Sequence, residues 1–496
     1  MIEFQNVSYC YDEANEGGIM DINFSAKKGE FVLLCGRSGC GKTTVTRCIN
    51  GLIPHFFEGT MSGHVFIDGQ DTAQMELRDI SKKVGSVFQD PRSQFFTTDT
   101  VSEVAFACEN MAIPHHELIE RVDAAIEKLN INHLRGKSLF ELSSGERQRI
   151  AIASVYALAP EVYVFDEPSA NLDAKATHEL AKTLSVLKAS GATVIISEHR
   201  LYYLKDLIDK VIYLEDGKIQ REFTATEFLA LSYPELNKLG LRCIDPNTLC
   251  LPEKVCSHGR AIVQIAGLSF RYRKNVKSLT DISFQAAKGC ITGIVGHNGA
   301  GKSTLAEVIC GLLKEESGAV FITDKRIPFK QRIPLSYFIM QDTEYQLFSE
   351  SVLDELTLGL GDAAEFKDEA ESVLETLHLT EYKDRHPASL SGGQKQRVVI
   401  AAAYMRDLKI VFFDEPTSGL DAENMKRVGN LMQDMAQKGI AVFVITHDYE
   451  LILNACQKIL RLDHGELVED YSLDKGTLPK LKQFFQILNK EGESHC

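Results

Sequence analysis

Short runs of consecutive apolar residues alternate along the chain with longer segments in which apolar residues recur every three or four positions. Residues 31–35, 162–166 and 193–197 (FVLLC, VYVFD and TVIIS) have the pattern of strands buried on both faces, and ITGIV, IVFFD and AVFVI repeat it later. The stretch from about residue 100 to 160 is poor in such runs and is predicted to be an inserted helical subdomain. The alternation predicts an α/β fold with a largely parallel core sheet.

This pattern occurs twice. Residues 144–173 recur as residues 392–421, and Glu415 and His447 each lie 248 positions after Glu167 and His199. A period of that length is too long for a solenoid and indicates two complete domains of one fold. Residues 243–259 contain two prolines and little periodicity, so they are predicted to be a linker. We therefore expect one domain at residues 1–242 and a second at residues 260–496.

The composition narrows the partners that the chain can bind. It has 496 residues, with 69 acidic and 54 basic side chains and a formal net charge of −15. Such a balance argues against a protein that coats nucleic acid or anionic lipid through bulk charge. No run of about 18 apolar residues occurs, so we do not expect a membrane span, and the first residues lack the pattern of a signal peptide. A negatively charged ligand must then be held by a local site.

Two glycine-rich segments supply such a site. GRSGCGKT (36–43) and GHNGAGKS (296–303) both fit the phosphate-loop pattern G-x-x-x-x-G-K-[ST], and each follows an apolar strand. The glycines allow successive backbone N–H groups to surround an anion at the positive end of a helix. Lys42 and Lys302 are predicted to reach the β- and γ-phosphates of a nucleotide, and Thr43 and Ser303 to ligate Mg²⁺.

Paired acids end one strand in each half, in VYVFDEP and IVFFDEP. A strand buried on both faces does not ordinarily end in two carboxylates without a reason. We expect Asp166 and Asp414 to hold Mg²⁺, directly or through water. Glu167 and Glu415 are then placed to polarise the water that attacks the γ-phosphate.

A third motif points to a family. LSSGE (142–146) and LSGGQ (390–394) stand at the same distance before the two acidic strands. With them, nearly the whole chain resembles the nucleotide-binding subunits of ATP-binding-cassette (ABC) transporters. The resemblance implies two tandem P-loop NTPase domains, each with an added antiparallel β part. It also implies that Ser143 and Ser391, at a helix start, contact ATP on the opposite domain.

The resemblance assigns further roles by position. Gln89 and Gln341 match the glutamine that contacts Mg²⁺ and senses a membrane partner, and His199 and His447 match the switch histidine at the γ-phosphate. Tyr11 and Tyr272 are expected to stack on adenine. The ATP-binding residues so implied are Tyr11, Gly36, Ser38, Gly39, Gly41, Lys42, Thr43, Thr44, Gln89, Ser143, Ser144, Gly145 and Asp173 in the first half, and Tyr272, Gly296, Asn298, Gly299, Gly301, Lys302, Ser303, Thr304, Gln341, Ser391, Gly392, Gly393 and Asp421 in the second.

Domains of this family work head to tail, which implies that each ATP is sandwiched between the phosphate loop of one half and the signature of the other. The first signature departs from LSGGQ at Ser144 and Glu146, so the site that uses it is expected to bind or hydrolyse ATP less well. Both halves retain the glutamate base and the switch histidine. We therefore expect both sites to be catalytically competent.

The segments that follow Gln89 and Gln341 indicate which ABC subfamily the chain resembles. Residues 88–106 and 340–358 share Gln-Asp-x-x-x-Gln-x-Phe followed by a glutamate, which resembles the ATPases of energy-coupling factor (ECF) transporters. Residues 224–241 also resemble the extension after an ECF cassette, whereas Thr343 stands where that family usually has proline. The resemblance implies uptake of a vitamin, a vitamin precursor or a transition-metal ion, with a transmembrane T-component and a substrate-binding S-component as partners. Glu103 and Glu355 are expected to attract arginines of the T-component.

Other tandem ABC proteins remain as alternatives. A sugar-importer ATPase has a similar length but commonly one degraded catalytic half, which this sequence does not show. A ribosome-binding translation factor would need a long charged linker, whereas the linker predicted here is short. A DNA-repair ATPase of the zinc-bearing type would need a cysteine-rich insertion, which neither half contains. The resemblance favours a peripheral protein at the cytoplasmic face of a membrane. Separately, Cys40 inside the first phosphate loop is a candidate reactive thiol, because a helix N-terminus and Lys42 lie beside it.

Overall fold

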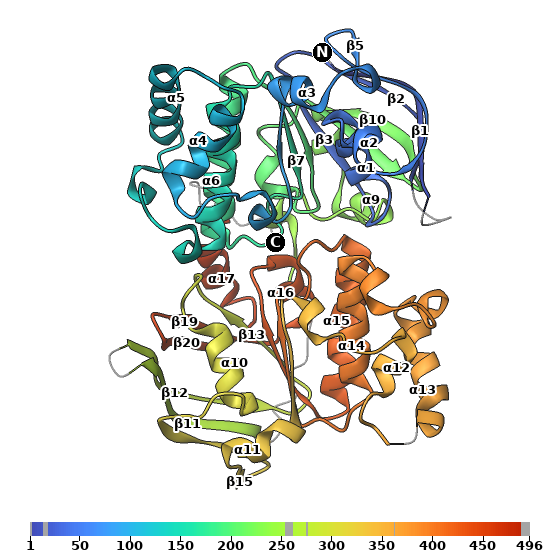
Figure 1. Ribbon diagram of the computed structural model, residues 1–496. Helices are drawn as coiled ribbons and strands as arrows, with labels where there is room; N and C mark the ends of the chain where they lie inside the picture. Colours follow the sequence, from blue (N-terminus) through green and yellow to red (C-terminus); the bar gives the residue numbers. More distant parts are fainter. Residues whose placement is uncertain (1, 13–17, 253–260, 274–275, 362, 488–496) are drawn as a thin grey trace. The chain divides into compact units, whose positions relative to one another are not determined.

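In the computed structural model, which describes residues 2–12, 18–252, 261–273, 276–361 and 363–487, the chain forms two compact units. The first extends to Thr248, and the second begins at Leu249. Ile244, within the predicted linker, is packed in the hydrophobic core of the first unit, and residues 253–259 lie outside the described residues. Figure 1 labels the helices and strands of each unit.

The first unit contains a six-stranded sheet and a separate four-stranded antiparallel sheet. The large sheet has the order β10-β9-β3-β8-β7-β6, with every pair parallel except β9 and β10. Its strands are β3 (Phe31–Gly36), β6 (Val84–Val87), β7 (Val162–Asp166), β8 (Thr193–Ser197), β9 (Lys210–Glu215) and β10 (Lys218–Thr224). The antiparallel sheet has the order β2-β1-β4-β5 and consists of β1 (Ile2–Tyr11), β2 (Gly18–Ala26), β4 (Gly59–Ile67) and β5 (Gln70–Asp71).

The predicted helical stretch forms three long helices beside the large sheet, drawn in teal in Figure 1. They are α4 (Thr100–Asn110), α5 (His115–Lys128) and α6 (Ser144–Ala157). The other helices of the unit are α1 (Lys42–Ile49), α2 (Leu52–His55), α3 (Leu77–Lys83), α7 (Ala174–Ala189), α8 (Ala225–Leu229) and α9 (Tyr233–Lys238).

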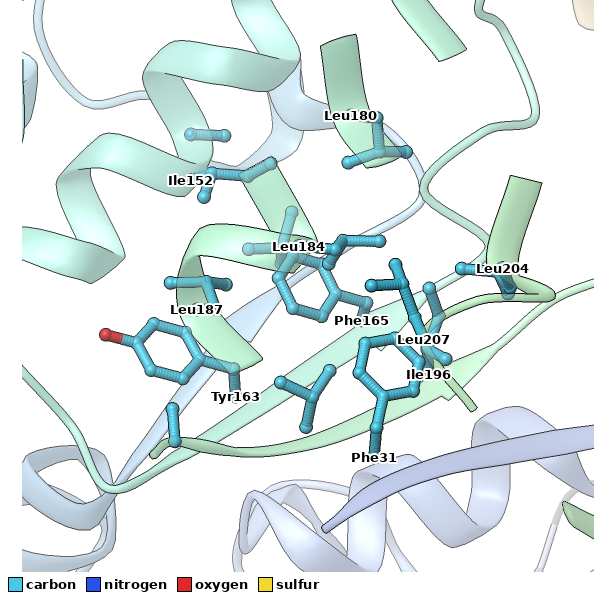
Figure 2. Close-up of a cluster of buried hydrophobic side chains, with 14 of the residues drawn as sticks. Phe31, Ile152, Tyr163, Phe165, Leu180, Leu184, Leu187, Ile196, Leu204 and Leu207 are labelled. Atoms are coloured by element: carbon cyan, nitrogen blue, oxygen red, sulfur yellow. The ribbon is translucent and has the colours of Figure 1, made fainter. Parts of the chain in front are cut away.

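Strand β3 shows why this sheet is buried on both faces. Successive side chains of a strand point to opposite faces, and here every position is apolar. Phe31 and Leu33 join the core formed with α6 and α7, whereas Val32 and Leu34 join the core beneath the antiparallel sheet. Figure 2 shows Phe31 among side chains from β7, β8, α6 and α7. The apolar runs read from the sequence are therefore the central strands.

The second unit repeats this architecture. Its large sheet has the order β16-β17-β18-β13-β19-β20, with only β20 antiparallel, and its small sheet has the order β12-β11-β14-β15. The strands are β11 (Ala261–Arg273), β12 (Val276–Ala287), β13 (Ile291–Val295), β14 (Ser317–Ile322), β15 (Lys325–Arg326), β16 (Ser336–Ile339), β17 (Ile410–Asp414), β18 (Ala441–Ile445), β19 (Lys458–Asp463) and β20 (Glu466–Ser472). The helices are α10 (Lys302–Cys310), α11 (Phe329–Arg332), α12 (Val352–Thr357), α13 (Ala363–Thr376), α14 (Gly392–Tyr404), α15 (Ala422–Gln437), α16 (Tyr449–Ala455) and α17 (Leu478–Phe484).

The predicted fold class is confirmed in both units: a mostly parallel core sheet, an antiparallel part and an inserted helical subdomain. Across the ranges that the structure describes, none of the helices combines the length and apolar character that crossing a bilayer requires.

Candidate nucleotide sites

The loop between β3 and α1 curls around its own lysine. Lys42 is buried, and its Nζ donates hydrogen bonds to the carbonyl oxygens of Gly36 (3.3 Å) and Arg37 (3.1 Å). Lys302 makes the same pair of bonds within the loop between β13 and α10. Each lysine is thus held under a ring of backbone at the start of a helix, where N–H groups point outward and favour an anion.

Glycine is required at the first position of each loop. Gly36 has φ of 148°, and a Cβ atom there would lie 2.1 Å from the carbonyl oxygen of Leu214 on the neighbouring strand. Gly296 has φ of 157°, and its Cβ would lie 2.4 Å from the carbonyl oxygen of Leu462. Any side chain would push the loop away from the sheet, so the loop can start this close to the strand ends only with glycine.

A cavity of about 470 Å³ in the second unit gathers most of the residues predicted there. Those that line it are Tyr272, Asn298, Gly299, Gly301, Lys302, Ser303, Thr304, Gln341, Asp414, Glu415 and His447. The cavity is also lined by Ser278, His464 and Gly465, which sequence reasoning missed because they lie on β12 and in the β19–β20 turn, far from any motif. Ser391, Gly392 and Gly393 are not among the described residues that line it.

A hydroxyl and a carboxylate meet at the phosphate end of each site. Asp166 ends β7 and accepts hydrogen bonds from Thr43 Oγ1 (3.3 Å) and from Ser197 Oγ. Asp414 ends β17 and accepts from Ser303 Oγ at 2.6 Å. Burial raises the pKa of both Asp166 and Asp414 above its ordinary value. A cation beside these carboxylates would relieve that cost of burial.

Oxygen donors of this kind suit Mg²⁺, which usually takes one or two protein ligands and completes its shell with phosphates and water. The donor set therefore fits a cation that arrives with the nucleotide. Thr43 and Asp166 would hold it in the first unit, and Ser303 and Asp414 in the second.

The glutamate after each of these aspartates lies beside the histidine predicted to act as the switch. In the first unit Glu167 Oε1 is 3.2 Å from His199 Nε2, and Glu167 Oε2 accepts a hydrogen bond from Gln89 Nε2 at 3.1 Å. Burial raises the pKa of Glu167, but His199 and Lys42 outweigh it and the net shift is downward. The carboxylate is thereby kept ionised, as a base must be.

The second unit shows the same neighbours with looser spacing. Glu415 Oε1 lies 3.6 Å from His447 Nε2, and Glu415 Oε2 accepts from the backbone N–H of His447 at 3.3 Å. Glu167 and Glu415 have positive φ angles of 45° and 49°, which are uncommon for residues other than glycine. Strain of this kind is retained where a side chain must be aimed.

Sequence reasoning missed the carboxylate that holds the backbone of His199. Glu198 is 2% exposed; its Oε1 accepts from the backbone N–H groups of His199 (2.8 Å) and Arg200 (3.1 Å). Its Oε2 accepts from Ser169 N at 3.3 Å and from Tyr203 Oη at 2.7 Å. The only available signal was a charged residue at the end of an apolar strand. Glu198 therefore ties the loop after Glu167 to His199.

Asp448 makes the corresponding connection in the second unit, from the other side of the histidine. It is buried, its Oδ2 accepts from Thr417 Oγ1 at 2.7 Å, and its Oδ1 accepts from Leu451 N at 3.2 Å. Thr417 and Ser169 lie at equivalent positions of the repeat. Both units thus anchor the same loop with a buried carboxylate, placed before the histidine in one and after it in the other.

The signature segments begin α6 and α14. Ser143 and Glu146 form a capping box, in which Glu146 Oε2 accepts from Ser143 N at 2.8 Å; Gln394 serves Ser391 in the same way. Glu146 therefore preserves the helix start that LSGGQ has, and its departure from that pattern leaves the local geometry intact. Gly145 has a packing reason, because a Cβ there would lie 2.6 Å from that of Ala176 on α7.

The remaining predicted residues occupy helix caps and strand ends. Asp173 caps α7 by accepting from Ala176 N at 2.8 Å, and Asp421 directly precedes α15. Tyr11 and Tyr272 end or nearly end β1 and β11. The pairing of a phosphate loop with the signature of the other unit stays a prediction.

Two expectations are wrong. Cys40 is 4% exposed, and burial raises the pKa of its thiol despite the opposing effect of Lys42, so it is not a thiolate poised to react. Glu103 and Glu355 are 2% and 4% exposed and face inward. They cannot attract a partner's arginines from these positions.

Comparison with known proteins places the chain in a family. Residues 19–170 and 279–418 match the family model described as ABC transporter. Over 96% of this chain and 98% of its own length, a Treponema denticola protein named "Putative ABC transporter ATP-binding protein" is 42% identical. The "Putative HMP/thiamine import ATP-binding protein YkoD" of Bacillus subtilis is 32% identical over 98% of this chain and 95% of its own length.

Among solved structures, ABCE1 in a "Model of ribosome-bound archaeal Pelota and ABCE1" aligns with a TM-score of 0.70 and 23% identity, covering 96% of this chain and 80% of that one. At that identity the likeness shows the fold alone. The family model and the relatives establish more: the chain belongs to the ABC transporter family. It is an ATP-binding ATPase with two nucleotide-binding domains.

Proposed function

We propose that this chain powers an ECF-type importer of a vitamin, a vitamin precursor or a transition-metal ion, working at the cytoplasmic face of the membrane. In this proposal a T-component docks on the ATPase and an S-component selects the substrate. The roles assigned above to Mg²⁺, ATP and the individual site residues belong to the proposal. It is carried by one observation: after its predicted Mg²⁺-contacting glutamine, each unit holds an exposed aromatic ring on a polar clamp made of a half-buried glutamine and a buried glutamate.

The clamp in the first unit has two anchors, the half-buried Gln94 and the buried Glu103. Gln94 accepts from the backbone N–H of Phe88 at 2.8 Å and donates to Ser86 O at 2.9 Å, which ties the loop to the end of β6. Glu103 Oε2 accepts from the backbone N–H groups of Phe96 (3.1 Å) and Thr97 (2.9 Å). Hydrogen-bonded polar groups that are buried or half-buried fix the path of a loop.

The second unit repeats the clamp. Gln346 bonds to Met340 N (2.8 Å) and Phe338 O (2.7 Å), and Glu355 Oε2 accepts from the backbone N–H groups of Phe348 and Ser349, both at 2.8 Å. The threonine at 343, where the resembled family usually has proline, starts the same short turn, Thr343–Gln346. The turn in the first unit is Pro91–Gln94.

The side chains that these clamps present are apolar. Phe96 is 72% exposed and stacks on Phe106, and Phe348 is 77% exposed. Placing a large apolar ring in water costs free energy unless a partner covers it, and a rigid loop costs little further entropy on docking. Two such rings at equivalent positions suit two apolar helices of one membrane partner. The "import" in the name of the Bacillus subtilis relative supports the same direction.

The test is co-purification from membranes of the host that makes the chain. We expect the wild-type chain to bring down small, highly apolar membrane proteins, and the double variant Phe96→Ser/Phe348→Ser to lose them while retaining ATP binding. The matched control is Leu229→Ser/Val468→Ser, which removes one partly exposed apolar side chain from each unit outside the clamps. Equal recovery from both double variants would contradict the proposal, as would sedimentation of the chain with ribosomes instead of membranes.

A further inference from the structure

The helix after each phosphate loop carries opposite charges at the same position. Arg47 and Glu307 each stand five residues after the loop lysine. Arg47 Nη1 donates to Tyr11 Oη at 3.0 Å, whereas Tyr272 Oη donates to Glu307 Oε2 at 3.2 Å. The two tyrosines expected to stack on the base are therefore held by a cation in one unit and by an anion in the other.

These charges lie close to the phosphate loop. Tyr11 Oη is 3.3 Å from Thr44 Oγ1, and Tyr272 Oη is 3.2 Å from Thr304 Oγ1. Each threonine directly follows the proposed Mg²⁺ ligand. Arg47 and Glu307 are thus linked to the loop through a single tyrosine hydroxyl, and a bound nucleotide with several negative charges lies within reach of their fields.

The two tyrosines also differ in the side chains that pack around them. The guanidinium of Arg47 lies 4.1 Å from the centroid of the Phe57 ring, and Tyr11 makes edge contacts with Phe57 (6.2 Å) and Tyr9 (4.8 Å). Tyr9 Oη in turn donates to Glu58 O at 2.9 Å. The ring of Tyr11 is therefore preorganised by an aromatic cluster, and ordering it on binding costs little.

Tyr272 has a more open environment. It is 57% exposed and makes an edge contact with Phe270 at 4.9 Å. His464 lies in the β19–β20 turn and lines the cavity of the second unit; the equivalent residue of the first unit is Asp216. The turn therefore places a negative charge in the first unit that the second unit lacks. The side chain of His464 is 97% exposed, and water screens charges at such a position. At these two pairs of positions, Arg47 with Asp216 against Glu307 with a neutral His464, the first unit is the more positive by one charge.

We propose that the first unit is the tighter nucleotide site and that Arg47 and Glu307 set the difference. The inference rests on the proposed placement of the base at Tyr11 and Tyr272. Exchanging a favourable for an unfavourable charge several ångströms from a nucleotide corresponds to about a 3- to 30-fold change in dissociation constant in a partly aqueous site.

The experiment uses the full chain with one phosphate loop disabled. Lys302→Ala leaves the first unit able to bind, Lys42→Ala leaves the second, and ADP with Mg²⁺ is titrated into each by calorimetry. We expect tighter binding by the Lys302→Ala chain. Adding Arg47→Glu to it should weaken ADP binding about 3- to 30-fold, and adding Glu307→Arg to the Lys42→Ala chain should strengthen it.

Two controls separate the causes. Arg78→Glu reverses an exposed charge on α3 of the same unit and should leave the ADP affinity unchanged. Tyr11→Ala should weaken ADP binding by the Lys302→Ala chain. Equal affinities in the two disabled chains, an effect of Arg47→Glu no larger than that of Arg78→Glu, or no effect of Tyr11→Ala would overturn the inference. None of these readouts involves membrane partners, so failure of the importer proposal would be seen separately.

Discussion

Glu198 provides the sharpest test of how the first site is held together. In Glu198→Gln the side chain keeps its size, but one oxygen that accepts two hydrogen bonds becomes an NH₂ group. Whichever way the amide turns, at least one buried backbone donor among those of Ser169, His199 and Arg200 loses its acceptor. An unsatisfied buried donor costs about 1–3 kcal/mol, and the bonds that remain lose their charge assistance.

We therefore expect Glu198→Gln to lower the free energy of unfolding by about 2–4 kcal/mol. For a unit of this size that corresponds to a fall of about 5–10 °C in melting temperature. Because Glu198 positions His199 and does not touch substrate, kcat should fall with little change in KM. Hydrolysis is measured in a Glu415→Gln background, so that the first unit's base is the intact one.

Tyr203→Phe is the matched control. Burial and the neighbouring Glu198 carboxylate raise the pKa of Tyr203 well above its ordinary value, so its hydroxyl stays protonated and donates. Removing it takes one bond from Glu198 but leaves every backbone donor satisfied, so we expect a loss of about 1 kcal/mol and nearly normal turnover. If Glu198→Gln melts and hydrolyses like Tyr203→Phe, the connection between the loop and the histidine is not what holds the site.

Three further predictions follow from the same geometry. Glu167→Gln and Glu415→Gln, made separately, should each slow hydrolysis at their own site about 10²- to 10⁴-fold in single-turnover assays; a variant that hydrolyses like wild type would mean that its site was already silent. Gly36→Ala should abolish ADP binding by the first unit in the Lys302→Ala chain, because its Cβ would meet a strand carbonyl at 2.1 Å, and unchanged calorimetric affinity would contradict this. At pH 8, iodoacetamide should label the exposed Cys10 well before the buried Cys40, whose thiol pKa is raised, as measured by mass spectrometry; equal rates would show that the loop opens.

Functional motifs whose residues are neighbours in the chain could be predicted from the sequence alone. The phosphate loops, the acid pairs at the strand ends and the helix starts at Ser143 and Ser391 each lie within about eight residues, so composition and local geometry specify them together. The central strands were equally plain, because a strand buried on both faces must be apolar at every position. Repetition of these signals about 250 positions apart predicted two copies of one fold.

The tertiary structure decided which polar side chains point inward and which are buried. From the sequence, Glu103 was a surface acid near a partner; folding turns it inward to accept two backbone N–H groups. Cys40 lies beside a lysine in sequence, but packing buries it, and desolvation outweighs the nearby charge. Hydrogen-bond partners and burial depend on segments far apart in the chain.

The same reason explains the contrast between the two sites. Arg47 and Glu307 look like ordinary helix-surface charges until β1 and β11 bring a tyrosine hydroxyl to each. Glu198 acquires its role only when β8 sets it beside the loop that follows β7. The sequence by itself predicted two ATP sites, because each motif is local. Only the tertiary structure decided which side chains hold each site in place. These contacts join residues that are far apart in the sequence, and no local pattern predicts such pairs.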